Sequence, residues 1–436
     1  MNHLKQKAKE ILSTNWRNGF TIPTAKLYPF QWNWDSGFVA MGFAQYDVQK
    51  AMQELQSLFS GQWQNGMVPH IIFHSENEST YFPNWDFWGT NVNAGTSQKP
   101  KTSGITQPPV HGFVLEFILS LHKDNEEVKA FAKQLFPKIV DSHRFLYNYR
   151  DPKKEGLFFI YHPWESGRDN SPIWDESLNR IVIDKDKLPK YERRDTKIAD
   201  SSERPTMDQY DRYVYLLQLG KTHQYDGKAI AEESPFLIQD CMMNAILIQA
   251  NKGLVNVAKQ LNLDYAEVEE WIQQGTTSFQ SKFWNEESQF YLTYDLRAEK
   301  QIAHKDIGGF IPLFAGLPDE TQANHLTKKL DDIKDKGFYL CPSFDIESPL
   351  FDSKRYWRGP VWPHMNWMLY QGLLQYQQND LAKTVLNDTL EIVDKAGFYE
   401  YFESKKSKYD QLDHGFGGNH FSWSASTVLN FLKDIE

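Results

Sequence analysis

Apolar residues recur at helical spacing over most of this chain, in segments that follow one another as adjacent pairs. The periodicity and the capping residues predict helices at 35–60 with a break near Asp47, 109–121, 126–149, 206–219, 234–252, 264–284, 306–316, 320–333, 361–376, 379–396 and 421–433. A short helix precedes them at the N-terminus, and 155–162 favours a short strand. We therefore expect an all-α protein.

Helices in sequential pairs stack as a solenoid or close into a ring. A solenoid requires a repeat of fixed length, and this chain has none. Aromatic and acidic residues instead gather in the connections after alternate helices, at 28–37, 81–88, 161–175, 356–364 and 399–416. Connections at one end of a ring would bring these clusters together. We therefore expect one domain over 1–436, a closed helical toroid with an aromatic, acidic mouth.

The segment 182–204 interrupts this pattern. It mixes Lys, Arg, Asp and Glu with few apolar residues. Such composition is typical of a solvated surface excursion, and a lid over the mouth is the alternative.

The content of aromatic residues narrows the class of ligand. The chain has 14 Trp, 21 Tyr and 29 Phe, and aromatic residues make up 15% of it. Part of this excess fills a core, but aromatic rings also stack on the C–H faces of sugars. The net charge of −10 disfavours a nucleic acid or an anionic membrane as partner, because both require clustered Lys and Arg. We expect a small flat ligand.

Cysteine usage and the N-terminus bear on the compartment. Only Cys241 and Cys341 are present, too few for a disulfide framework or a thiolate metal site. The N-terminal stretch lacks the apolar core of a signal peptide, and no segment has the uncharged length of a membrane span. We expect a cytoplasmic protein without a metal or another cofactor, and the sequence leaves its oligomeric state open.

One stretch, 165–172 with Trp174 and Asp175, has the composition of a functional turn. It reads ESGRDNSP, so Gly167 precedes Asp169 by two residues and turn-forming residues follow it. Such a turn holds a carboxylate in one orientation. A loop that caps a helix has similar composition.

Three further stretches carry candidate chemistry. At 356–364, Arg358 lies among aromatic residues and would bind a carboxylate, sugar hydroxyls or a neighbouring loop, with Pro360 opening a helix. At 397–403, Glu400 lies among aromatic rings, which raise the pKa of a carboxyl by removing its hydration. At 102–109 a polar loop ends in two prolines.

Two carboxyls across an aromatic cleft meet the requirement of glycoside hydrolysis, in which one acid protonates the departing oxygen and the other attacks the sugar or activates water. Competing chemistries lack their motifs. The chain contains no GxSxG, HExxH, CxxC or GxxxxGK[ST].

Several motifs resemble glycoside hydrolase family 63 and the related trehalases: ESGRDNSP with Trp174 and Asp175, RGPVW at 358–362, YEYF at 399–402 and HFSWSAS at 420–426. YPFQWNWDSGF at 28–38 and SGITQPP at 103–109 resemble its compact bacterial members. The resemblance implies an (α/α)6 toroid with short strands in the connections on the active-site side, and an inverting mechanism. Arg168 departs from it, because many members carry a tryptophan-like residue there, and the sequence leaves open the sugar preference at that wall.

The resemblance also implies roles for individual residues. Asp169 would be the general acid and Glu400 the general base, while Asp175 and Glu165 would be structural neighbours. The residues implied in substrate binding are Tyr28, Trp34, Asp35, Gln107, Trp164, Gly167, Arg204, Tyr210, Tyr356, Trp357 and Trp362. Asp35 could equally cap the helix that follows it.

The compact members that the chain resembles hydrolyse mannosylglycerate or glucosylglycerate, so a small α-glycoside with a carboxylate is the expected substrate. The resemblance places Arg204, Tyr210 and Tyr356 near that carboxylate, with Arg212 as a further candidate. The alternatives are an α-glucosidase or trehalase acting on a neutral disaccharide, an epimerase using His364 and His414, and a non-catalytic sugar-binding protein.

Overall fold

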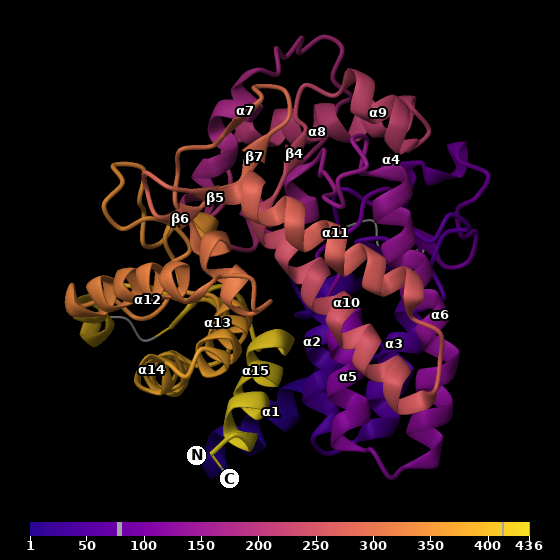
Figure 1. Ribbon diagram of the computed structural model, residues 1–436. Helices are drawn as coiled ribbons and strands as arrows, with labels where there is room; N and C mark the ends of the chain where they lie inside the picture. The colour runs from indigo at the N-terminus through magenta and orange to yellow at the C-terminus, as the bar shows by residue number, and fades with distance from the viewer. Residues whose placement is uncertain (76–80, 412–413, 436) are drawn as a thin grey trace.

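The computed structural model describes residues 1–75, 81–411 and 414–435, and it is mostly helical (Figure 1). The α-helices are α1 (Asn2–Asn15), α2 (Asn33–Ala44), α3 (Val48–Phe59), α4 (Trp85–Trp88), α5 (His111–Leu121), α6 (Glu126–Tyr149), α7 (Asp175–Asn179), α8 (Met207–Thr222), α9 (Gly227–Glu233), α10 (Cys241–Leu261), α11 (Ala266–Phe283), α12 (Glu320–Asp335), α13 (Pro363–Gln375), α14 (Asn379–Ala396) and α15 (Ser422–Lys433). The prediction of a predominantly helical chain is confirmed.

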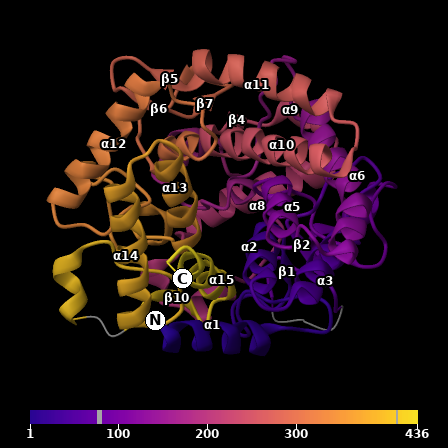
Figure 2. The same ribbon diagram turned by 60° about the horizontal axis from the view of Figure 1, so that its bottom comes forward.

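Helices that are buried over most or all of their circumference form the interior. Every residue of α2 is buried, and α10, α13 and α15 are buried on most of their faces. The helices α3 and α14 have one buried stripe each and lie outside them, as do α1, α6, α11 and α12 (Figure 2). Gly112 brings α5 against α10, because a Cβ there would lie 2.1 Å from the Ala250 carbonyl oxygen.

The interior helices contact one another in a closed order. The helix α2 packs on α5, α5 on α10, α10 on the 3₁₀ helix η6 (Ile307–Leu313), η6 on α13, α13 on α15 and α15 on α2. The helices α3, α6, α11 and α14 each pack on the interior helix that precedes them in the chain. The pairing expected from the sequence thus holds for these four pairs, whereas α12 packs on α14 and β6.

Short strands occupy several connections. They form β1–β2–β3 (Gln31–Trp32, Ile71–Phe73, Lys101–Thr102), β9–β10 (Tyr399–Tyr401, Phe416–Asn419), β4–β7–β8 (Ile238–Gln239, Tyr294–Asp295, Lys300–Gln301) and β5–β6 (Trp284–Asn285, Phe290–Tyr291), all paired antiparallel. The strand β1 leads directly into α2, and β9 carries Glu400.

Some expected elements differ from the structure. The predicted strand 155–162 contributes only an isolated bridge between Ile160 and Ile238. Its backbone is satisfied by a side chain instead, since the Asn244 amide both accepts from the Phe158 N–H at 2.9 Å and donates to the Phe158 carbonyl at 3.0 Å. The predicted helix 306–316 is 3₁₀ over Ile307–Leu313, because Pro312 lacks an amide N–H.

Two helices begin at other residues than the sequence predicts. The helix α10 begins at Cys241 and not near 234, since Asp240 caps its N-terminus by accepting from the Met242 N–H at 3.1 Å. The helix α13 begins at Pro363 and not at Pro360. Asp35 lies inside the first turn of α2, whose N-cap is Trp32, so the alternative of Asp35 as the cap is wrong. Within the described residues, no helix is long and apolar enough to cross a membrane.

Candidate active site

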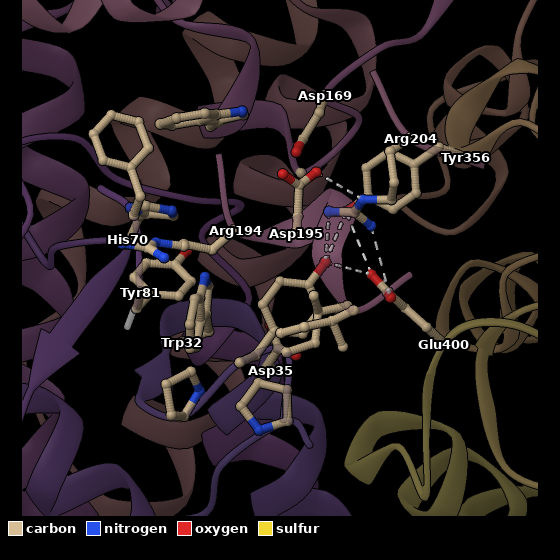
Figure 3. A pocket seen from close by; sticks show the side chains of 18 of the residues that line it. Trp32, Asp35, His70, Tyr81, Asp169, Arg194, Asp195, Arg204, Tyr356 and Glu400 are labelled. Carbon is tan, nitrogen blue, oxygen red and sulfur yellow. Dashed lines mark hydrogen bonds and ion pairs between the residues drawn. The ribbon is translucent and has the colours of Figure 1, made fainter. Parts of the chain in front are cut away.

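A cavity of about 190 Å³ opens where β1, β9 and the loops after α6 and α7 meet (Figure 3). The candidate site residues that line it are Tyr28, Trp34, Asp35, Gln107, Trp164, Gly167, Asp169, Arg204, Tyr210, Tyr356 and Glu400. Segments far apart in the chain therefore meet at one aromatic, acidic pocket.

Asp169 lies in a turn whose shape depends on Gly167. The φ angle of Gly167 is +69°, and a Cβ at this position would lie 2.4 Å from the Trp34 ring. Only glycine combines this angle with such close approach. The Tyr213 hydroxyl donates to the Asp169 carbonyl at 2.7 Å and so fixes the turn on its other side. The carboxyl of Asp169 is thereby directed into the pocket (Figure 3).

Burial makes Asp169 a weak acid. Desolvation raises its pKa to about 7, against the lowering effect of Arg204 and with a further increase from Glu400. A carboxyl with this pKa retains its proton below neutral pH and can donate it.

Arg168 points away from the pocket. Its guanidinium donates to both carboxylate oxygens of Asp240 at 2.6 Å and pairs with Asp306, and all three side chains are buried. Arg168 does not line the pocket, because these two carboxylates hold its guanidinium. Two neighbouring acids serve the same turn: Glu165 pairs with Arg150 at 3.1 Å and Asp175 with Arg358 at 2.8 Å, so neither faces the pocket.

Glu400 enters the pocket from β9 and accepts several hydrogen bonds. Its carboxylate accepts from the Tyr28 hydroxyl at 2.9 Å, the Tyr356 hydroxyl at 3.3 Å and the Gly418 N–H at 3.0 Å. Burial raises its pKa, whereas Arg204 and these donors lower it. Donors that stabilise the charged form suit a carboxylate that must act as a base.

Arg204 is the cation between the two acids (Figure 3). Its Nε donates to Asp195 at 3.2 Å, its Nη2 donates to the Tyr28 hydroxyl at 3.1 Å, and its guanidinium lies 4.3 Å from the centre of the Tyr356 ring. Nη1 is buried and has no hydrogen-bond partner among the described residues. A buried donor without a partner favours an anionic or hydroxyl-bearing ligand.

Comparisons with known proteins identify the family of this chain. A family model described as "Mannosylglycerate hydrolase MGH1-like glycoside hydrolase domain" matches residues 28–424. This chain belongs to that glycoside hydrolase family. The chain is 44% identical over 429 residues to a mannosylglycerate hydrolase of Thermus thermophilus, covering 98% of this chain and 100% of that protein. It is 31% identical over 444 residues to a glucosylglycerate hydrolase of Mycolicibacterium hassiacum, covering 98% and 97%.

Solved structures agree with the sequence comparison. The crystal structure of a family 63 mannosylglycerate hydrolase of Thermus thermophilus, in complex with Tris and D-glycerate, superposes with a TM-score of 0.92 at 43% identity, covering 99% of this chain and 100% of the other. Neutral trehalase of Saccharomyces cerevisiae shares the fold more distantly, with a TM-score of 0.57 at 17% identity, covering 95% of this chain and 73% of the other. The resemblance to glycoside hydrolase family 63 that the motifs carry is confirmed.

Some candidate residues of this glycoside hydrolase lie outside the pocket. Trp357 and Trp362 do not line it, because they stack on each other with ring centres 3.8 Å apart and are fully buried. Arg212 pairs with Asp208 and donates to the Leu178 carbonyl at 2.9 Å, and it does not line the pocket either.

The histidines of the epimerase alternative are also misplaced. His364 is enclosed by aromatic rings, with the Trp423 ring centre 4.2 Å away, and His414 is exposed elsewhere. Neither lines the pocket. The two together therefore cannot exchange protons with a bound sugar.

Several residues of the wall were not predicted from the sequence. Trp32, Tyr81 and Trp423 line the pocket from stretches that contain several aromatic residues, and His70 lines it from the connection after α3. Asp195 lines it as well, although it belongs to the charged segment 182–204. That segment is a wall of the pocket in this region, so its interpretation as a solvated excursion is wrong there.

No cluster of three potential metal ligands occurs among the described residues.

Proposed function

We propose that this glycoside hydrolase cleaves a small α-glycoside of glycerate, mannosylglycerate or glucosylglycerate, into hexose and glycerate with inversion at the anomeric carbon. The main observation behind the proposal is a pair of carboxyls in different environments, Asp169 and Glu400. Both line one pocket together with the Arg204 guanidinium. The names of the full-length relatives support the substrate class.

In this mechanism Asp169, protonated because it is desolvated, donates its proton to the glycosidic oxygen as the bond to the anomeric carbon breaks. Glu400 removes a proton from a water molecule that attacks the opposite face of the sugar. The hydroxyls of Tyr28 and Tyr356 hold the Glu400 carboxylate in position.

The remaining predicted wall divides into two parts. Trp34, Asp35, Gln107 and Trp164 would surround the sugar, where Gln107 already accepts from the Trp34 N–H at 3.3 Å. Arg204, with Tyr210 and Tyr356, would receive the glycerate carboxylate, since the unpartnered Nη1 needs an acceptor. Gly167 supplies the space beside the acid.

We also propose that the fold is the (α/α)6 toroid, as one domain. The closed order of contacts among α2, α5, α10, η6, α13 and α15 supports it, with a 3₁₀ segment in place of one inner helix.

Purified protein incubated with each glycerate glycoside tests the function, with proton NMR of the hexose recorded before mutarotation. Release of the β-anomer from an α-glycoside is expected. Release of the α-anomer would contradict inversion, and equal activity on a neutral disaccharide such as trehalose would contradict the glycerate assignment.

A further inference from the structure

Two arginines and one aspartate of the segment 193–204 form a charged group on the wall of the pocket. Asp195 accepts from Nε of Arg193 at 3.1 Å and from Nη2 of Arg193 at 2.7 Å, and it also accepts from Nε of Arg204 at 3.2 Å. The side chains of both arginines are 5% exposed, and that of Asp195 is 12% exposed. One carboxylate therefore serves two nearly buried guanidiniums.

The segment is fastened on both sides of this group. Arg193 donates to the Pro205 carbonyl at 2.6 Å and lies 4.3 Å from the centre of the Tyr210 ring. Farther along the segment, the Tyr401 hydroxyl donates to the Glu203 carbonyl at 3.2 Å. These contacts hold Asp195 at a fixed place relative to the pocket.

Arg204 lies between two competing carboxylates. Its Nη1 is 3.9 Å from Glu400, beyond hydrogen-bonding range, whereas its Nε is 3.2 Å from Asp195. A buried guanidinium without Asp195 would gain by closing the gap to Glu400, because charge-assisted hydrogen bonds are the strong ones. Such a pair would make Glu400 a weaker base and turn the cation away from an aglycone.

The net charge of this group also suits an anionic aglycone. Two guanidiniums and one carboxylate leave a single net positive charge, and Arg204 and Asp195 of this group line the pocket. One positive charge matches a monoanionic aglycone, and like charges would otherwise repel within the wall.

We propose that Asp195 is a positioning residue that holds Arg204 away from Glu400 and toward the aglycone, and so determines the selectivity for an anionic aglycone. This inference rests on the proposed function, because it assigns the carboxylate of the substrate to Arg204. Asp195 itself contacts neither the sugar nor the reacting atoms in this account.

The test compares Asp195→Ala, Asp195→Asn and the wild type on two substrates, a glycosylglycerate and the matching glycosylglycerol, in which a neutral hydroxymethyl group replaces the carboxylate. Asp200→Asn is the matched control, because Asp200 lies in the same segment but pairs with the exposed Lys354 at 3.2 Å. Binding of D-glycerate alone is measured by calorimetry, and thermal unfolding verifies that each variant is folded.

In Asp195→Ala, KM for the glycosylglycerate should rise about tenfold or more, while KM for the glycosylglycerol stays within about twofold. The value of kcat should fall for both substrates, because Arg204 then pairs with Glu400. Asp195→Asn retains an acceptor for the guanidinium and should recover much of kcat, and Asp200→Asn should match the wild type.

Parallel changes in KM for the two substrates, or equal D-glycerate affinity in Asp195→Ala and the wild type, would overturn the inference. Should Asp195→Ala not fold, the same comparisons made with Asp195→Asn decide it, where weaker D-glycerate binding than in the wild type is expected. Failure of the proposed function has a different outcome, in which the wild type binds D-glycerate and hydrolyses neither substrate.

Discussion

Arg168 donates to both carboxylate oxygens of Asp240 at 2.6 Å, directly beneath the turn that carries the candidate acid. Arg168 and Asp240 are completely buried, and Asp306 is a second carboxylate partner of Arg168. The residue next to the candidate acid thus stabilises the structure around the turn and does not line the pocket.

Replacement of Arg168 should therefore destabilise the protein. Arg168→Met leaves two buried carboxylates without their cation, and a loss of about 3–5 kcal/mol in the free energy of unfolding is expected. Chemical denaturation measures it. The matched control is Arg144→Met, since Arg144 forms partly exposed pairs with Asp141 and Glu267, and its loss should cost less than about 1 kcal/mol. Similar values for the two variants would contradict the burial argument.

The two catalytic roles can be separated with a substrate that needs no acid. Asp169→Asn should lower kcat on a glycosylglycerate by about 10³-fold but leave most of the activity on the corresponding α-glycosyl fluoride, because fluoride departs without protonation. Glu400→Gln should lower kcat by a similar factor on both substrates, because water still requires a base. Steady-state kinetics provide the measurement, and the reverse pattern would exchange the two roles.

The activity should have a bell-shaped dependence on pH. It requires Asp169 protonated, so kcat/KM should fall as pH rises through about 7, the pKa to which burial raises this carboxyl. It also requires Glu400 ionised, which sets the limb at lower pH.

Removing the cation between the acids should shift this profile. Arg204 lowers the pKa of both Asp169 and Glu400, so in Arg204→Met both limbs should move to higher pH. The same substitution should lower kcat/KM for the glycosylglycerate by about 10²-fold through loss of a charge-assisted contact. An unchanged profile, recorded from pH 4 to 9, would show that Arg204 does not act on these acids.

The raised pKa of Asp169 should also affect the free energy of unfolding. Its pKa in the folded state, about 7, is above the ordinary 3.8, so folding favours the protonated form. The contribution of Asp169 to the free energy of unfolding should therefore fall as pH rises from about 4 to about 7, and Asp169→Asn should be more stable than the wild type at pH 8 by up to about 4 kcal/mol. At pH 4 the two should unfold at the same denaturant concentration. Equal stability at both pH values would contradict a desolvated acid.

Local patterns in the sequence were sufficient for much of this description. Helical periodicity identified α6 and α14 to the residue, because each has a continuous buried stripe and clear ends. Periodicity was less informative for α10, whose start depends on a single capping residue, Asp240. It also failed at η6, where apolar residues have helical spacing but Pro312 prevents an α-helix.

In the candidate site, too, some residues were predicted from the sequence and others were not. Asp169 and Glu400 lie in stretches of distinctive composition that resemble motifs of family 63, so both were candidates before the fold was known, and both line the pocket. Trp357 and Trp362 lie in an equally distinctive stretch, yet they stack within the core. Composition indicates that a ring is needed at a position but not which side of the wall it faces.

Short runs of sequence predicted the helical hairpins and, through their resemblance to family 63, the candidate acids Asp169 and Glu400 and the class of reaction, because each of these motifs consists of residues close together in the chain. The tertiary structure alone decided which side chains share the pocket. Asp195, Arg204 and Glu400 are separated by up to about two hundred residues, and their mutual positions depend on contacts that no local pattern encodes. Charge balance in a desolvated wall is a property of three dimensions, and for this reason 182–204 resembled a solvated excursion until its partners were in place.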